Sequence, residues 1–356
     1  MLDQYGRKID YLRISVTDRC NLRCRYCMPE PIDAVQHDDI LRYEEMLRIC
    51  RAAAELGITK FKVTGGEPLV RAGCAEFIAA LKTQPGTQQV TLTTNGLLLE
   101  KNLDALTAAG LDGVNISLDT TDNARFRRIT GYTGDGADTL LRVLDVCCAK
   151  GLRTKINAVM LEETEADAPA LAGIASMLPV DVRFIELMPI GFGTSMRRVS
   201  PEDIFAVLKE RWPDLAPTDE KRGNGPAHYY KSAALLGRIG FIDAVSHKFC
   251  AGCNRVRLTS TGQLKPCLCY ADSADLRTLI RGGLKLPAQA VRHDADGTDY
   301  VYVLCAGVVE RRGAELIYSD KDCCLADPNG SGDALREGER VILSGTDIYE
   351  GKVLTQ

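Results

Sequence analysis

Short runs rich in β-branched residues alternate along the first half of the chain with longer segments in which apolar residues recur at intervals of three and four. The runs are YLRISV, KFKVTGG, VTLTTNG, GVNISLD, RTKINAV and VDVRFIELM. The longer segments, such as YEEMLRICRAAAELG, end in glycine, as helices often do. Repeated strand–helix units predict parallel strands joined by right-handed crossovers, either in an open sheet or in a barrel.

Polar and small residues gather near the ends of these runs. They are Thr64 to Glu67, Thr93 to Gly96, Ser117, Asp119, Lys155, Asn157, Glu186 and Met188. Each alone also fits a turn that ends a strand. Their repetition at successive strands favours an active site at the rim where α/β folds build one.

The pattern changes twice further along the chain. After Met188, a helix is expected to begin at Ser200, with Pro201 in its first turn. From Leu284 onward, the runs DYVYVL, VVERR, ELIYS and ERVILSG predict a separate all-β piece, interrupted by the irregular CLADPNGSGDA. We therefore predict three parts, with the boundaries 1–190, 191–283 and 284–356.

Composition limits the setting of the protein. The 356 residues carry a net charge of -4, and no basic excess indicates nucleic-acid binding. The sequence shows neither a signal peptide nor a long apolar run, so we expect no membrane span and a cytoplasmic location. Fourteen cysteines in a reducing compartment favour metal sites over disulfides.

Three cysteines, Cys20, Cys24 and Cys27, follow the first predicted strand with the spacing C-x3-C-x2-C. An iron–sulfur cluster accepts several thiolates from one loop, whereas a structural zinc site normally has four protein ligands. Three thiolates on a four-iron cluster would leave one iron open to the amine and carboxylate of S-adenosylmethionine. A distant fourth donor, and with it a zinc site, stays open as the alternative.

A second group contains Cys250, Cys253 and Cys267 in FCAGCNRVRLTSTGQLKPC. With Cys269 as a fourth ligand this group would read as a zinc ribbon. The alternating Arg255 and Arg257 favour another purpose, because two guanidinium groups on one side of a strand can hold an anion.

CNLRCRYC after a strand, followed by TGGEPL, resembles the radical S-adenosylmethionine superfamily. RISVTDRCNLRCRYCMPE together with FCAGCNRVRLT and Cys267 resembles, within that superfamily, the GTP 3',8-cyclase family of molybdenum cofactor (molybdopterin) biosynthesis, over residues 3–282. The resemblance implies an α/β fold: an incomplete (βα)6 TIM-like barrel at 1–190 and a C-terminal region with a second cluster at 191–283. The small all-β extension at 284–356 lies outside it.

The resemblance also implies the site residues and cofactors. The cofactors are two 4Fe-4S clusters and S-adenosylmethionine. Cys20, Cys24 and Cys27 would hold the first cluster, and Cys250, Cys253 and Cys267 the second. S-adenosylmethionine would contact Tyr26, Gly66, Ser117 and Met188. GTP would contact Arg13, Lys62, Thr93, Lys155, Arg255, Val256 and Arg257, with Arg183 as a further candidate.

The implied activity is a lyase reaction that cyclises GTP to (8S)-3',8-cyclo-7,8-dihydroguanosine 5'-triphosphate. Its partners would be an electron donor and a downstream cyclic pyranopterin monophosphate synthase, and a homodimer stays open. Three alternatives remain: another radical enzyme with an auxiliary cluster, such as a peptide maturase; a folded but impaired cyclase; and a non-enzymatic iron–sulfur or zinc protein.

Two features depart from the family pattern. Lysine stands at Lys62, where the family commonly has arginine, and it keeps the charge without the planar fork. The family's tail of paired glycines is missing, since Gly282 and Gly283 come too early. The segment after them resembles the membrane-proximal β domain of periplasmic efflux adaptors, and its Cys305, Cys323 and Cys324 read as structural.

Overall fold

The six predicted strands form one parallel array in the computed structural model. The structure describes residues 2–3, 6–27, 35–269, 272–319, 323–327, 332–343, 345 and 347–353. The strands are β1 (Tyr11–Ser15), β2 (Lys60–Thr64), β3 (Gln89–Thr94), β4 (Gly113–Ser117), β5 (Thr154–Val159) and β6 (Asp181–Ile185). Each pairs in parallel with the next.

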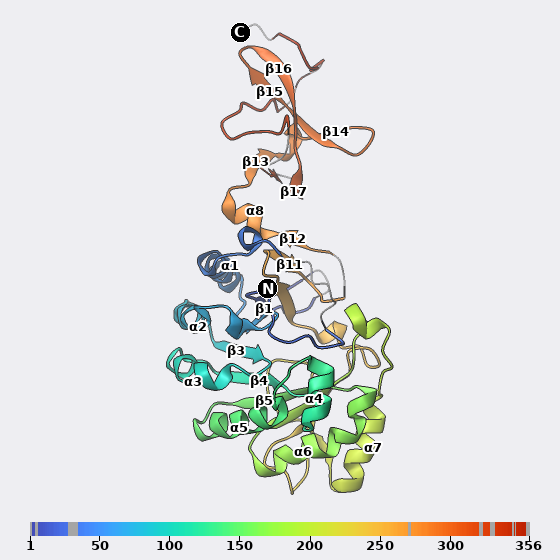
Figure 1. The fold of residues 1–356 in the computed structure, drawn as a ribbon. Helices are drawn as coiled ribbons and strands as arrows, with labels where there is room; N and C mark the ends of the chain where they lie inside the picture. Colours follow the sequence, from blue (N-terminus) through green and yellow to red (C-terminus); the bar gives the residue numbers. More distant parts are fainter. Residues whose placement is uncertain are drawn as a thin grey trace. The chain divides into compact units, whose positions relative to one another are not determined.

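Helices connect these strands (Figure 1). They are α1 (Tyr43–Glu55), α2 (Cys74–Thr83), α3 (Leu99–Ala108), α4 (Asn123–Thr130), α5 (Gly136–Ala149) and α6 (Ala168–Met177). The helix expected at Ser200 is α7 (Pro201–Arg211), where the Ser200 side chain accepts a hydrogen bond from the Asp203 amide. This prediction of a capped helix is confirmed.

The array continues at both ends with strands from later in the chain. Beside β1 lies β10 (Arg255–Leu258), and beside β6 lies β9 (Ile239–Ile242), both parallel to their neighbours. Antiparallel strands β8 (His228–Lys231) and β7 (Ala216–Thr218) follow β9. The row of strands does not return on itself among the described residues, so the barrel predicted from sequence is present in its incomplete form.

The two faces of the array differ because side chains alternate along a strand. One face carries buried apolar residues such as Ile14, Val63, Leu92 and Ile116. The other, here called the polar face, has residues that strand register places side by side. It comprises Tyr11, Arg13, Lys62, Thr91, Thr93, Asn115, Lys155, Asn157, Asp181, Arg183, Arg255 and Arg257.

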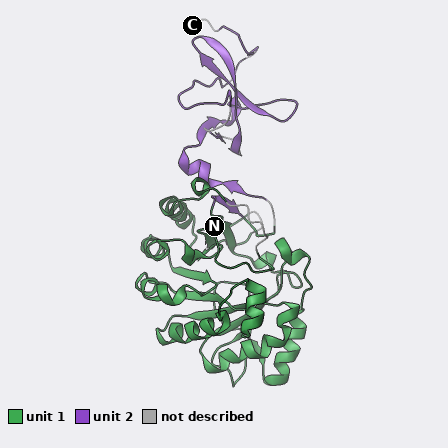
Figure 2. Cartoon of the chain, viewed as in Figure 1, with its two compact units in different colours: residues 1–260, 266–270 green, residues 261–265, 271–356 purple. Residues whose placement is uncertain are grey.

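The chain divides into two compact units, coloured separately in Figure 2. Unit 1 comprises residues 1–260 and 266–270, and unit 2 comprises residues 261–265 and 271–356. Unit 2 begins with β11 (Gln263–Lys265), β12 (Ala274–Asp275) and α8 (Leu276–Arg281). Gly282 ends α8 with φ +113°, which gives this glycine a helix-capping position. The predicted three-part division stays a prediction.

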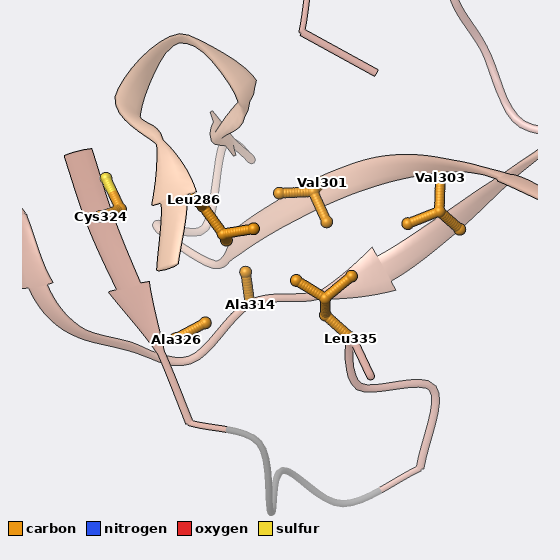
Figure 3. Packing of buried hydrophobic residues seen from close by; sticks show 7 residues of the cluster. All are labelled: Leu286, Val301, Val303, Ala314, Cys324, Ala326 and Leu335. Atoms are coloured by element: carbon orange, nitrogen blue, oxygen red, sulfur yellow. The ribbon is translucent and has the colours of Figure 1, made fainter. Parts of the chain in front are cut away.

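The rest of unit 2 is built from strands, as expected from its alternating runs. One sheet has the order β13 (Leu284–Pro287), β18 (Cys323–Ala326), β17 (Leu316–Ser319); the other has β14 (Arg292–His293), β15 (Asp299–Cys305), β16 (Val308–Gly313). Val301, Val303 and Leu335 lie in a hydrophobic core made by this unit (Figure 3).

Two details of unit 2 differ from the sequence interpretation. Part of CLADPNGSGDA is not irregular, because Cys324–Ala326 belong to the central strand β18. ERVILSG forms no strand in its described residues and contributes an isolated bridge from Val341 to Val303. Throughout the described ranges, no helix is long and apolar enough to cross a membrane.

Candidate active site

The first three cysteines lie on the loop that leaves the carboxyl end of β1. The main chain of this loop is fixed to the end of α4, because Arg23 and Arg25 amides donate to the Thr130 and Ile129 carbonyls at 2.8 and 2.9 Å. All three cysteines are free thiols. Burial raises the pKa values of Cys24 and Cys27, and Asp119 and the neighbouring thiols raise them further.

Tyr26 anchors the same loop to the sheet. Its hydroxyl donates to Asp119 Oδ2 at 2.7 Å, and Asp119 Oδ1 accepts from the Val159 amide at 2.8 Å. Gly66, which was predicted to contact S-adenosylmethionine, also packs against this loop. A Cβ built on Gly66 would lie 2.3 Å from the Arg19 carbonyl oxygen. Only glycine lets the end of β2 approach the cysteine loop so closely.

The donor set of this loop fits a multi-iron cluster better than a single ion. No three His, Cys, Asp or Glu side chains in the described part of the chain are arranged to hold one metal ion. A 4Fe-4S cluster takes its thiolates at separate irons, so its ligands need not converge on one point. The three thiols on one anchored loop therefore fit the group, and cluster binding would release their protons.

In the second cysteine group, Cys250 and Cys253 precede the amino end of β10, and Cys267 follows β11. Cys250 and Cys253 share a turn in which the Cys253 amide donates to the Cys250 carbonyl at 3.2 Å. Burial alone would raise the pKa of Cys253, but hydrogen bonds and charge from Arg255 lower it overall. Cys269, the alternative zinc ligand, donates its amide to Cys267 Sγ at 3.5 Å. Arg7 Nη1 donates to the Cys250 carbonyl at 3.1 Å.

Between the two cysteine groups runs a band of cations on the polar face. Because β1 and β10 are parallel neighbours, the first group follows the carboxyl end of one and Cys250 and Cys253 precede the amino end of the other. Arg13 lies between Lys62 and Arg257 in register. Arg183, from β6, donates to Asn157 Oδ1 at 2.6 Å.

These cations repel one another in a place with little water. Burial lowers the pKa of Lys62 far below its usual value, and Arg183, Arg13 and Lys155 lower it further. Burial and then Arg13 lower the pKa of Arg257 to about 9. The Nε atoms of Arg13 and Arg183 are buried and have no hydrogen-bond partner. Unpaired buried donors in a cationic cluster fit a polyanionic ligand.

Lys155, another predicted GTP contact, already has partners in the structure. Its ammonium donates to Asp181 Oδ2 at 2.8 Å and to Tyr229 Oη at 3.0 Å. Thr93 lies on the polar face and accepts from Asn115 Nδ2 at 3.3 Å. Val256 pairs with Leu12 on the opposite face, so only its main chain is available to a ligand there.

The sequence interpretation missed two residues of this site. Asp181 and Arg222 contact partners far away in the chain, and no local pattern marks them. Asp119 was named among the polar residues at strand ends, but its contact with Tyr26 was not predicted. Arg183 was assigned only a secondary rank, although it follows the same alternation that places Arg13 and Lys62 on the polar face. Ser117 ends β4, and Met188 lies half-buried just beyond β6.

Comparison with known proteins agrees with this geometry. The Radical SAM superfamily model matches residues 14–173, and the model named Molybdenum Cofactor Synthesis C matches residues 180–293. A GTP 3',8-cyclase of Heliobacterium modesticaldum is 46% identical over 289 residues, covering 80% of this chain and 88% of the relative. One of Clostridium perfringens is 42% identical over 286 residues, covering 80% and 88%.

Solved structures share the fold at low identity. Streptococcus suis SuiB bound to S-adenosylmethionine matches with a TM-score of 0.57 and 16% identity, over 76% of this chain and 63% of that chain, which is less than two thirds of it. The native anSMEcpe structure with bound AdoMet matches with a TM-score of 0.52 and 17% identity, over 74% and 75%. These likenesses show the α/β fold, and the sequence relatives decide the family: the chain belongs to the GTP 3',8-cyclase family of the radical SAM superfamily.

Proposed function

We propose that this chain cyclises GTP to (8S)-3',8-cyclo-7,8-dihydroguanosine 5'-triphosphate in molybdenum cofactor biosynthesis. One observation carries the proposal beyond family membership: a buried band of cations lies between two cysteine groups at opposite ends of neighbouring strands. A triphosphate brings the negative charge that Arg13, Lys62 and Arg257 need. Their mutual repulsion in the free protein would be offset by attraction to the bound anion.

Cys20, Cys24 and Cys27 would hold the cluster that serves S-adenosylmethionine. A cluster held there would supply the electron for reductive cleavage of bound S-adenosylmethionine. The chain's own residues would orient the cofactor: Tyr26 lies on the cysteine loop, and Gly66, Ser117 and Met188 lie at or just beyond the carboxyl ends of β2, β4 and β6. Lys62, Lys155 and Arg183 are buried on the polar face, and limited access of water there would protect a reactive radical from stray hydrogen donors.

The second cysteine group would hold a second 4Fe-4S cluster through Cys250, Cys253 and Cys267. Arg255 follows Cys253 by two residues and begins β10, so a ligand at this cluster would also lie near the arginines of the polar face. This arrangement supports a role in binding GTP. Arg255, Val256, Arg257, Thr93 and Lys155 complete the proposed GTP contacts, Val256 through its main chain.

The proposed reaction also implies two protein partners. An external electron donor is needed, and a downstream cyclic pyranopterin monophosphate synthase would consume the product. A homodimer and a cytoplasmic location stay predictions. The second family match ends at residue 293, and no role is proposed for the residues after it.

The test is a reaction under anaerobic conditions with both clusters reconstituted. Protein, dithionite, S-adenosylmethionine and GTP are incubated, and 5'-deoxyadenosine and cyclised nucleotide are followed by mass spectrometry. We expect both products from the wild type and neither from Cys24→Ala. Cys148→Ala, which removes a half-buried thiol on α5, is the matched control and should keep both products.

Each other outcome has a defined meaning. 5'-Deoxyadenosine without cyclised GTP would indicate an impaired cyclase or another substrate, and thus contradict the proposed product. Neither product from protein with intact clusters would overturn the radical reaction itself.

A further inference from the structure

The ammonium group of Lys155 has no hydrogen left for a substrate. A lysine ammonium has three donors, and here they meet Asp181 Oδ2, Tyr229 Oη and the Arg222 carbonyl. Lys155 and Asp181 are both almost completely buried. Any bond from Lys155 to a phosphate must therefore replace one of these three.

Asp181 is shared between two cations. Lys155 Nζ lies 2.8 Å from Oδ2, while Arg222 Nη2 lies 2.9 Å from Oδ1 and its Nε lies 3.3 Å from the same oxygen. Burial would raise the pKa of Asp181, but the Arg222 and Lys155 partners lower it overall. The carboxylate thus stays charged, and it keeps one cation if the other leaves.

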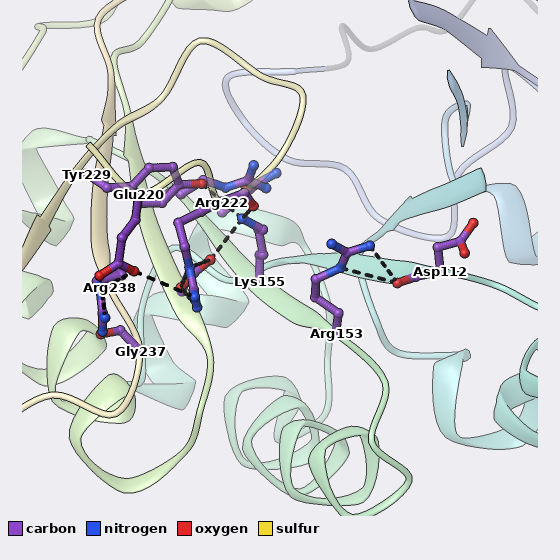
Figure 4. Close-up of polar contacts among 11 residues, drawn as sticks. Asp112, Arg153, Lys155, Glu220, Arg222, Tyr229, Gly237 and Arg238 are labelled. Carbon is purple, nitrogen blue, oxygen red and sulfur yellow. Dashed lines mark hydrogen bonds and ion pairs between the residues drawn. The ribbon is translucent and has the colours of Figure 1, made fainter. Parts of the chain in front are cut away.

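Arg222 also lies near Glu220, which is bound by Arg238. Glu220 Oε1 accepts from Arg238 Nη2 at 2.9 Å, and Glu220 Oε2 lies 3.9 Å from Arg222 Nη1. Figure 4 shows Lys155, Arg222, Tyr229, Glu220 and Arg238 gathered in this network. Two residues further along the chain, Asn224 donates its side-chain amide to Gln89 Oε1 at the start of β3. The segment with Arg222 is therefore tied to the amino ends of several strands.

Lys155 also belongs electrostatically to the cation band. It is among the charges that lower the pKa of Lys62, and its neighbour in register is Asn115, which bonds Thr93. An anion bound at Lys62 must therefore extend along the polar face, past β3 and β4, to reach Lys155. If Lys155 turned to that anion and Arg222 were absent, Asp181 would be a bare buried carboxylate beside a second negative group.

We propose that Asp181 and Arg222 are positioning residues for the triphosphate of the substrate: they hold Lys155 in the free protein, and Arg222 alone neutralises Asp181 when Lys155 turns to the phosphate. The inference rests on the proposed function, because it requires GTP to bind at the polar face. Neither residue touches the substrate; both act through Lys155.

The test is a double-mutant cycle read by GTP binding to the reconstituted protein without reductant. Arg222→Gln should raise the dissociation constant of GTP about tenfold, and adding Asp181→Asn should restore it to within about threefold of wild type, because the uncompensated charge is gone. Guanosine, which has no phosphate, should bind all variants alike. Arg153→Gln is the matched control, since Arg153 contacts the Asp112 carbonyl and not Asp181 (Figure 4).

A purely structural role of Arg222 would give a different pattern. The double variant would then bind GTP no better than Arg222→Gln, or guanosine binding would weaken in parallel, and either result overturns the proposal. If Asp181→Asn fails to fold, Arg222→Lys decides instead: keeping a cation should hold GTP binding within about threefold of wild type, and a loss as large as that of Arg222→Gln refutes the charge argument. A wild type that binds no GTP refutes the proposed function and the inference with it.

Discussion

Tyr26 donates a hydrogen bond of 2.7 Å to Asp119 and so fixes the first cysteine loop to the carboxyl end of β4. The two residues are 93 positions apart, and Asp119 is also bonded to the Val159 amide of β5. One buried carboxylate therefore joins the loop to two strands. The strength of these two hydrogen bonds should decide how firmly the three thiols are held in place.

Removing the Tyr26 hydroxyl should loosen this loop. Tyr26→Phe is expected to lower the free energy of unfolding of the metal-free protein by about 1–2 kcal/mol, because it breaks a hydrogen bond to a buried carboxyl group. In the reconstituted protein, iron should pass faster to a chelator. Tyr349→Phe, at an exposed tyrosine of unit 2, is the control. Equal iron loss from both variants would contradict the anchoring role.

Asp119 should make stability depend on pH. Burial raises its pKa from 3.8 to about 6, against the opposing hydrogen bonds from Val159 and Tyr26. The folded state thus holds a proton that the unfolded state releases, and stability present below pH 4 is lost as pH rises through 6. Between these limits the metal-free wild type should lose about 2–3 kcal/mol relative to Asp119→Asn. Urea unfolding of both proteins at several pH values measures this difference. If the free energy of unfolding changed with pH equally in the two proteins, the prediction would be wrong.

Lys62 should destabilise the metal-free protein and strengthen GTP binding. Its pKa lies well below the usual value because it is buried among other cations. Lys62→Met should therefore stabilise the metal-free protein by about 1–2 kcal/mol, while weakening GTP binding about tenfold through loss of a charge-assisted bond. Thermal unfolding and GTP titration measure the two effects. Lys101→Met, at an exposed lysine of α3, should change neither. A destabilised Lys62→Met would show that the repulsion is not the dominant effect.

Unit 2 should unfold through its own core. Val303 is fully buried in a cluster formed by residues of that unit alone. Val303→Ala should lower the stability of unit 2 by about 2 kcal/mol and increase cleavage after residue 284 in limited proteolysis, with the fragment of unit 1 unchanged. The exposed Val353 provides the control variant Val353→Ala. Loss of both units together would indicate a single cooperative structure.

Much of the architecture could be predicted because it depends on local sequence patterns. Alternating runs gave the strands β1 to β6, and Ser200 with Pro201 marked the start of α7. The cysteine spacings and TGGEPL identified the superfamily. The irregular interpretation of CLADPNGSGDA was wrong in part, because Cys324 and Ala326 become strand residues by pairing with β13, which lies far away in sequence.

The sequence by itself determined the order of strands and helices, the two cysteine groups and the type of chemistry that they imply. Only the tertiary structure decided which charges meet. Strand register sets Arg13 between Lys62 and Arg257. The loop between β7 and β8 brings Arg222, 41 residues away in the chain, to the carboxylate of Asp181. Local patterns depend on neighbours in the chain, whereas a buried charge takes its properties from whatever folding places within a few ångströms of it.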